Sequence, residues 1–217
     1  IIAVVLSIAV FLYRVIVLIL LLRTGRPDYR GGLGWTEGVG ERVSSAFRYV
    51  LGQTSIVRND PYAGIMHILI FWGFVILTPE VGESIASGIL PDFSLATLLG
   101  PDLFNVYRLL QDIFAAVVII GIAMALYRRY VIRPPKLETT REALYILMLI
   151  LMVMVTMYGF TAFQLSSSSA PYNWMPISQA LGDLIRKTGI SIGVRENAAQ
   201  SFLLAHNLTL LFFLPYV

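Results

Sequence analysis

Two histidines, His67 and His206, are the side chains in this sequence that are best suited to hold a metal. They are the only two histidines among 217 residues, and each lies within an apolar run. Polar side chains in such runs are costly and usually functional. Two neutral imidazoles on facing helices can occupy both axial positions of one haem iron. The alternative is structural, with each histidine hydrogen-bonding a neighbouring helix. Cysteine is absent, which excludes disulfides and cysteine-held iron–sulfur clusters within this stretch.

Small residues beside both histidines leave room for a flat cofactor. Ala63 and Gly64 lie one turn before His67, and Ala205 directly precedes His206. Apolar walls for such a cofactor are expected from the nearby aromatic residues Phe71, Phe74, Phe202 and Phe213.

The composition places the chain in a membrane. Hydrophobic residues make up 57% of it and charged residues only 13%, whereas a soluble domain carries about 25% charged residues. A water-soluble globule and a disordered chain are therefore excluded. A bilayer core needs roughly 20 apolar residues in helix, and five stretches approach that length, 1–22, 63–85, 105–127, 142–163 and 198–217. We predict an all-α fold, a polytopic membrane protein in which five transmembrane helices form one bundle and residues 1–217 form one domain.

The loop charges predict how the helices are oriented. Lys and Arg number six in 23–62 and five in 128–141, against none in 79–104 and three in 164–197. The positive-inside rule then places the N-terminus outside and the C-terminus in the cytoplasm. The excess of basic residues is explained by loop charges that lie at the lipid headgroups, so no nucleic-acid partner is expected. In the first of these loops, the residues 37–51 combine apolar and charged side chains at helical spacing, which predicts an interfacial amphipathic helix or a helix docked on the bundle.

Three arginines are candidates for binding a cofactor. Arg14 lies midway along the first predicted span, where a haem propionate would be a bidentate partner. Arg48 precedes the second span and is suited to a propionate, a quinone head group or a lipid headgroup. Arg108 is spaced i, i+4 from Asp112, which predicts an ion pair between them. Contact of Arg108 with a quinone or a haem propionate is the alternative.

Other polar positions lie near the outer side of the predicted bundle. Glu80 and Glu83, just after Pro79, are either solvated caps of the second span or groups that carry protons to or from the outside. The segment 164–197 is predicted to be a loop that begins with a tract of serines. Gly159, between two aromatic residues, is expected to mark a close approach of two helices.

Short strings around these residues resemble a known family. Residues 48–53 read RYVLGQ, residues 64–74 read GIMHILIFWGF, and residues 126–134 read LYRRYVIRP. The last span carries AHN at 205–207 ahead of LPY at 214–216. Together they resemble the nitrate reductase gamma-subunit-like cytochrome b domain. The resemblance is stronger to the version fused to a cytoplasmic, heterodisulfide-reductase-like iron–sulfur protein, and it covers all five predicted spans.

The resemblance implies b-type haem held by histidines on the second and fifth spans. Nitrate reductase members carry two histidines on each of these spans, whereas this sequence has one on each. It therefore implies one bis-histidine haem b, with His67 and His206 as the axial ligands on the cytoplasmic side. An iron–sulfur domain is expected to follow Val217 in the cytoplasm. Some members of this group are thought to pass electrons from electron-transfer flavoprotein to menaquinone.

These expectations combine into one functional prediction. The chain is expected to be the membrane part of a quinone-linked oxidoreductase in the inner membrane of a prokaryote. Its haem b would link a cytoplasmic iron–sulfur or flavoprotein partner to the quinone pool, with quinone as substrate and the iron–sulfur clusters outside this segment. The alternatives are a haem-free membrane anchor for a soluble redox partner and a small transporter.

Overall fold

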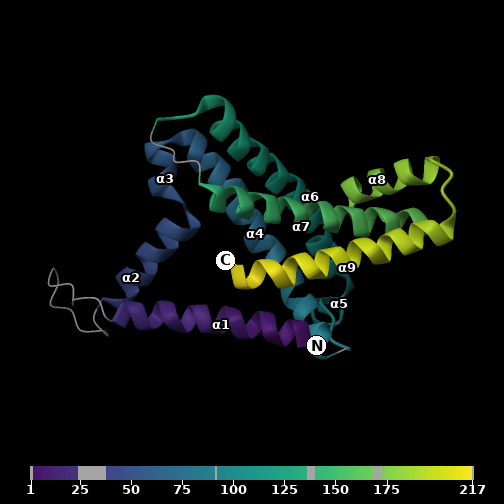
Figure 1. Ribbon diagram of the computed structural model, residues 1–217, viewed down its shortest axis with the longest axis horizontal. Helices are drawn as coiled ribbons and strands as arrows, with labels where there is room; N and C mark the ends of the chain where they lie inside the picture. Colours follow the sequence, from purple (N-terminus) through teal and green to yellow (C-terminus); the bar gives the residue numbers. More distant parts are fainter. Residues whose placement is uncertain are drawn as a thin grey trace.

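The fold is helical throughout the part of the chain that the structure describes (Figure 1). This computed structural model describes residues 2–23, 38–90, 92–135, 140–168, 172 and 174–216. Its five long helices are α1 (Ile2–Arg23), α4 (Pro61–Ile89), α6 (Pro101–Tyr127), α7 (Arg141–Ser167) and α9 (Ile192–Tyr216). The shorter ones are α2 (Val39–Ala46), η1 (Phe47–Leu51), α3 (Thr54–Asn59), α5 (Leu95–Leu99), η2 (Arg128–Ile132) and α8 (Pro176–Lys187). The all-α prediction is confirmed.

Four helical stretches are long and apolar enough to cross a bilayer, by length and composition. They are Ile2–Leu21, Pro61–Ser87, Pro101–Ile132 and Arg141–Ser167. The chain is accordingly a helical membrane protein. The fifth predicted span is also a helix, and α9, at 25 residues, is about 37 Å long. It is not among the four, because polar side chains such as Glu196, His206 and Asn207 interrupt its apolar run. The predicted ends at Ile1 and Val217 lie outside the described residues.

The second predicted span extends further than its apolar residues suggest. Its helix continues through Pro79 as far as Ile89. Proline removes one backbone hydrogen bond from a helix, but neighbouring helices and hydroxyl side chains tolerate this within a membrane. In the turn before the proline, the Thr78 hydroxyl donates to the carbonyl of Phe74 at 2.7 Å. Both Glu80 and Glu83 therefore lie on a continuous helix.

A helix occurs where a loop was predicted. Within 164–197, the residues Pro176–Lys187 form α8, which packs against α7. Ser166 and Ser167 belong to α7 rather than to the loop, whereas Ser169 lies outside the described residues. Gly182 of α8 allows the close contact, because a Cβ there would lie 2.9 Å from the carbonyl oxygen of Ala162.

The predicted ion pair between Arg108 and Asp112 is wrong. The Asp112 side chain is fully buried, at 0% exposed, and its carboxylate caps the N-terminus of α8. It accepts hydrogen bonds from the amides of Ile177 at 2.6 Å and Ser178 at 3.1 Å, and from the Ser178 hydroxyl at 2.5 Å. The first amides of a helix lack partners within it and carry a positive partial charge, so they satisfy a carboxylate without a cation. The guanidinium of Arg108 therefore forms no ion pair with Asp112.

Glycines allow the long helices to approach closely. A Cβ on Gly73 of α4 would lie 2.0 Å from a methyl group of Val118 on α6, and one on Gly159 of α7 would lie 2.4 Å from the Phe202 ring on α9. The close approach predicted at Gly159 is confirmed. Figure 1 shows α4 and α6 alongside each other and α7 lying across them, with α9 below α7 and α1 beneath α9. Between them, buried residues of α6 and α7 such as Val118, Ile122 and Met157 form the core.

An ion pair joins the start of α4 to the end of α6. Asp60 caps α4 by accepting from the Ala63 amide at 3.0 Å, and it pairs with Arg128 at 2.5 Å. Beside it, the Tyr62 hydroxyl donates to the Met124 carbonyl at 3.1 Å. The hydrogen bond from Arg128 lowers the pKa of Asp60 from 3.8 to about 2. The pair fixes the two antiparallel helices at this end of the bundle.

The lowered pKa of Asp60 predicts how stability depends on pH. The unfolded chain takes up this proton more readily than the folded one, so the contribution of the pair is complete above pH 3.8 and is lost as pH falls to about 2. Asp60→Asn keeps a capping side chain but removes the charge. In thermal unfolding followed by circular dichroism in detergent, we expect the variant to lose less stability than wild type across this interval. Asp102→Asn, at an exposed position, is the control, and an unchanged pH slope in Asp60→Asn would contradict the prediction.

Candidate functional site

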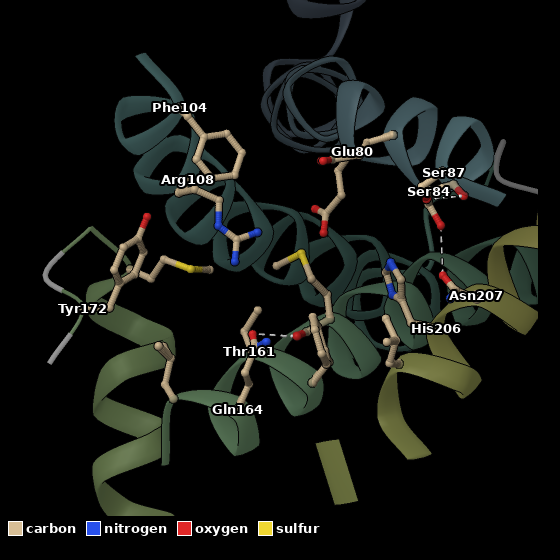
Figure 2. A pocket seen from close by; sticks show the side chains of 16 residues that line it. Glu80, Ser84, Ser87, Phe104, Arg108, Thr161, Gln164, Tyr172, His206 and Asn207 are labelled. Atoms are coloured by element: carbon tan, nitrogen blue, oxygen red, sulfur yellow. Dashed lines mark hydrogen bonds between the residues drawn. The ribbon is translucent and has the colours of Figure 1, made fainter. Parts of the chain in front are cut away.

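A cavity of about 590 Å³ lies between α4, α6, α7 and α9 (Figure 2). One part of its wall is apolar, and is formed by Phe104, Met157, Phe160, Leu165, Met175 and Leu203. The rest is polar, and is formed by Glu80, Glu83, Ser84, Ser87, Arg108, Thr161, Gln164, Tyr172, His206 and Asn207. An apolar pocket with a few convergent polar groups is the usual form of a small-molecule site.

His206 is the most buried ionisable group in the polar wall. Its side chain is 7% exposed, and its Nδ1 lies 3.2 Å from the Val153 carbonyl and 3.1 Å from the Thr156 hydroxyl of α7. A carbonyl can only accept, so the geometry assigns the proton to Nδ1. Within the described chain, no hydrogen bond reaches Nε2, and in Figure 2 the ring borders the cavity. Such an Nε2 carries a lone pair that is available to a ligand.

A glutamine separates the two opposite charges in the cavity. The Gln111 side chain, 1% exposed on α6, donates from Nε2 to the Glu80 carboxylate of α4 and to the Tyr107 hydroxyl. Its Oε1 accepts from Arg108 at 3.4 Å. The guanidinium of Arg108 also lies over the Phe104 ring, at 5.9 Å from the centroid. Carboxylate and guanidinium therefore both face the cavity instead of pairing with each other. Figure 2 shows both side chains directed inward.

Sequence reasoning missed Gln111, because a single glutamine in an apolar span carries no spacing signal of its own. The available signal was the register of α6, since Gln111 follows Tyr107 by four residues and Arg108 by three, which places all three on one face of the helix.

The other predicted site residues lie away from the cavity. Arg14 is exposed on α1 and donates to the Tyr216 carbonyl at 3.0 Å. Arg48 is exposed on η1. His67 is exposed on α4, where its ring stacks on Phe71 with the centroids 6.5 Å apart. The structure thus brings Arg108 and His206 to one cavity, and it does not bring His67, Arg14 or Arg48 there.

The arrangement of the two histidines does not fit one bis-histidine haem. The first α4 residue on the cavity wall is Glu80, which lies thirteen positions after His67, or about 20 Å along the helix. The space beside His67 is also taken, because a Cβ on Gly64 would lie 2.5 Å from the Cα of Val57 on α3. The small residues before His67 therefore pack against α3.

Comparison with known proteins relates the chain to electron-transfer oxidoreductases. One relative, a probable iron-sulfur-binding oxidoreductase FadF of Bacillus subtilis, is 28% identical over 181 residues, covering 82% of this chain and 24% of the relative. Another, the EtfAB:quinone oxidoreductase of Syntrophomonas wolfei, is 22% identical over 162 residues, covering 67% of this chain and 22% of the relative. The chain thus spans about a quarter of the length of the curated relatives it matches. No protein-family profile matches it, and neither does any solved structure.

Disulfide cross-linking tests which residue of α4 lies beside His206. The Ser84 hydroxyl donates to the Asn207 side chain at 3.0 Å, so the pair Ser84→Cys and Asn207→Cys is expected to oxidise readily in membranes. This segment has no cysteine of its own to interfere. The control pair, His67→Cys with His206→Cys, is expected to stay reduced. Cross-linking of the control pair, read as a mobility shift on a non-reducing gel, would contradict this arrangement.

Proposed function

We propose that this chain is the membrane electron-transfer part of a quinone-linked oxidoreductase, and that the cavity holds the quinone head group. The single observation that carries the proposal is the buried His206, whose Nε2 borders a cavity also lined by Arg108 and Glu80. Intramembrane ionisable groups mark substrate or proton pathways by default. The likeness to proteins named as an iron-sulfur-binding oxidoreductase and as an EtfAB:quinone oxidoreductase supports the choice of a quinone.

The chemistry of the wall suits both redox states of a quinone. An oxidised quinone presents two carbonyl acceptors, and the Arg108 guanidinium is a donor that cannot lose its charge. A hydroquinone presents two hydroxyl donors, and Nε2 of His206 is an acceptor. The apolar part of the wall, with Phe104 and Phe160, suits the flat ring between them.

The proposed topology has five crossings, with the C-terminus in the cytoplasm. The loop charges support it. The helix directions support it as well, since α4 and α6 run antiparallel through Asp60 and Arg128. By contrast, α1 and α9 run parallel, with Ser7 bonded to Leu211 and Arg14 bonded to Tyr216. Odd-numbered spans share one direction in any chain that crosses at every span, and α1 and α9 are the first and fifth.

The proposed partners are a cytoplasmic iron–sulfur domain or subunit and, beyond it, electron-transfer flavoprotein. The bacterial relatives, which are about four times as long as the part they share with this chain, support the first. The name EtfAB:quinone oxidoreductase supports the second. Menaquinone in the inner membrane of a prokaryote is the proposed acceptor.

Binding of a quinone probe tests the cavity. We expect menadione to quench the tryptophan fluorescence of the purified protein saturably, because Trp174 adjoins Met175 of the cavity wall. Loss of one hydrogen bond in His206→Leu or Arg108→Leu should raise the Kd about tenfold. His67→Leu is the matched control, and its Kd should stay within about twofold of wild type. An equal rise of the Kd in His206→Leu and His67→Leu would contradict the proposed quinone site. A wild-type protein that shows no saturable quenching would favour the membrane anchor.

Haem b stays a prediction of the family resemblance. It is tested by a reduced-minus-oxidised optical spectrum of the purified full-length protein, in which the resemblance predicts a b-type α-band, whereas the separation of His67 from the cavity predicts no band that depends on both histidines. Bis-histidine ligation by His67 and His206 predicts that His67→Ala and His206→Ala each abolish the band, because removing either axial ligand changes the haem. An intact protein with no Soret band would contradict the haem prediction. It would not bear on quinone binding, which the menadione experiment tests separately. A band kept in His67→Ala would contradict the ligand pair.

A further inference from the structure

A polar stripe runs along the last turns of α4, from the cavity toward the end of the helix. Its residues are Glu80, Glu83, Ser84 and Ser87, and all four line the cavity. Their spacing of i, i+3, i+4 and i+7 places them on one face of the helix. The helix ends at Ile89, so the stripe spans about 10 Å from Glu80 to Ser87, about half a turn from the helix end. Figure 2 shows Glu80, Ser84 and Ser87 along this helix, facing His206 and Asn207.

Hydrogen bonds hold the side chains of the stripe in place. Glu80 accepts from Gln111 through one of its two oxygens. Glu83 also accepts through one oxygen, from the amide of Leu95 at 2.9 Å. Leu95 is the first residue of α5. The Ser87 hydroxyl donates to the Ser84 carbonyl at 3.2 Å. Each carboxylate therefore keeps a second oxygen with no hydrogen bond within the described chain.

We propose that this stripe is the proton route of the cavity, with Glu80 exchanging protons with the bound quinone and Glu83 relaying them to water at the α5 end of the bundle. The inference rests on the proposed function, and it adds the group that makes and breaks the O–H bonds. A cavity that is polar toward one end of the bundle needs such a route, because a proton on a quinone oxygen cannot cross the surrounding hydrocarbon.

Reduction of the quinone consumes two electrons and two protons. Two electrons, supplied one at a time by an iron–sulfur carrier of the partner, reduce the quinone. Each of its two carbonyl oxygens gains a proton, so that two O–H bonds form and the ring becomes a hydroquinone. Glu80 gives up a proton to the quinone oxygen and regains one through Glu83. Oxidation of a hydroquinone reverses each transfer, and the protons then leave at the α5 end.

The other charged and titratable groups around Glu80 set its role. Arg108 of α6 and His206 of α9 line the same cavity, Tyr107 accepts from the Gln111 amide that also donates to Glu80, and Glu83 lies one turn along the same helix as Glu80. Gln111 is a positioning residue, because its amide lies between the Glu80 carboxylate and the Arg108 guanidinium. Direct pairing of those two charges would hold Glu80 ionised and remove its proton from use.

The experiment measures menadione reduction by the full-length protein in proteoliposomes, with reduced electron-transfer flavoprotein as donor. Because a positioned acid contributes 10²-fold or more to a proton transfer, we expect Glu80→Gln to lower kcat by about tenfold or more, with KM and the menadione Kd within about threefold. Glu83→Gln should lower kcat in the same way. Glu80→Asp should restore part of it, and so should formate added to Glu80→Gln, since both supply an acid.

Asp102→Asn is the matched control, because it removes an exposed carboxylate near the same end of the bundle. Its kcat should equal that of wild type. Full activity in both Glu80→Gln and Glu83→Gln, in proteins that bind menadione normally, would overturn the proton route alone. A wild-type protein that neither binds nor reduces menadione would overturn the proposed function and this inference with it. A loss of kcat that formate does not rescue and Glu80→Asp does not restore would also overturn the route.

Discussion

The buried carboxylate of Asp112 is the interaction on which the site depends. A charge with 0% exposure inside a membrane protein must be fully satisfied, and here the N-terminus of α8 satisfies it through Ile177 and Ser178. This contact seats α8 against α6, and the residue just before α8, Met175, forms part of the cavity wall. It also leaves the guanidinium of Arg108 without a carboxylate partner on its own helix, so that Arg108 faces the cavity.

Polar side chains with fixed hydrogen-bond partners recur elsewhere around the cavity. Gln111 satisfies Glu80 and Arg108 together, and a neutral amide between two opposite charges keeps both available. His206 is fixed through Nδ1 on α7, which leaves Nε2 to the cavity. Glu80, Arg108 and His206 thus each use part of the polar group for structure, and all three side chains line the cavity. This division explains how so few reactive residues can form a site within an apolar bundle.

Sequence reasoning located the helices well and the contacts between them poorly. Hydrophobic runs of about 20 residues predict helices because lipid leaves the backbone no alternative, and all five predicted spans are helical in the structure. The short amphipathic α8 was missed, because its apolar residues are too few to stand out from a polar loop. Spacing also predicted an Arg108–Asp112 pair, since i, i+4 neighbours are the partners visible in a sequence. It could not show that a helix 65 residues later along the chain would supply better donors.

The two histidines also show that the sequence does not predict which residues of different helices lie at the same level. His206 was predicted as a ligand and does line the cavity, whereas His67 does not. Their sequence positions fix a place along each helix but leave the relative shift of α4 and α9 open. That shift is set by side-chain contacts such as Ser84 with Asn207, and Gly64 accommodates α3 instead of a cofactor.

The attachment of α1 gives the site a further dependence, on the thickness of the bilayer. Most of α1 is exposed along its apolar length, and two hydrogen bonds, from Ser7 and Arg14, attach it to the last turns of α9. A helix of this length, about 30 Å over its 20 apolar residues, tilts when the hydrocarbon layer becomes thinner. Because α9 is joined to it in parallel, such a tilt acts on α9 and hence on the ring of His206. Hydrophobic mismatch is thus transmitted from the lipid-facing helix to the cavity.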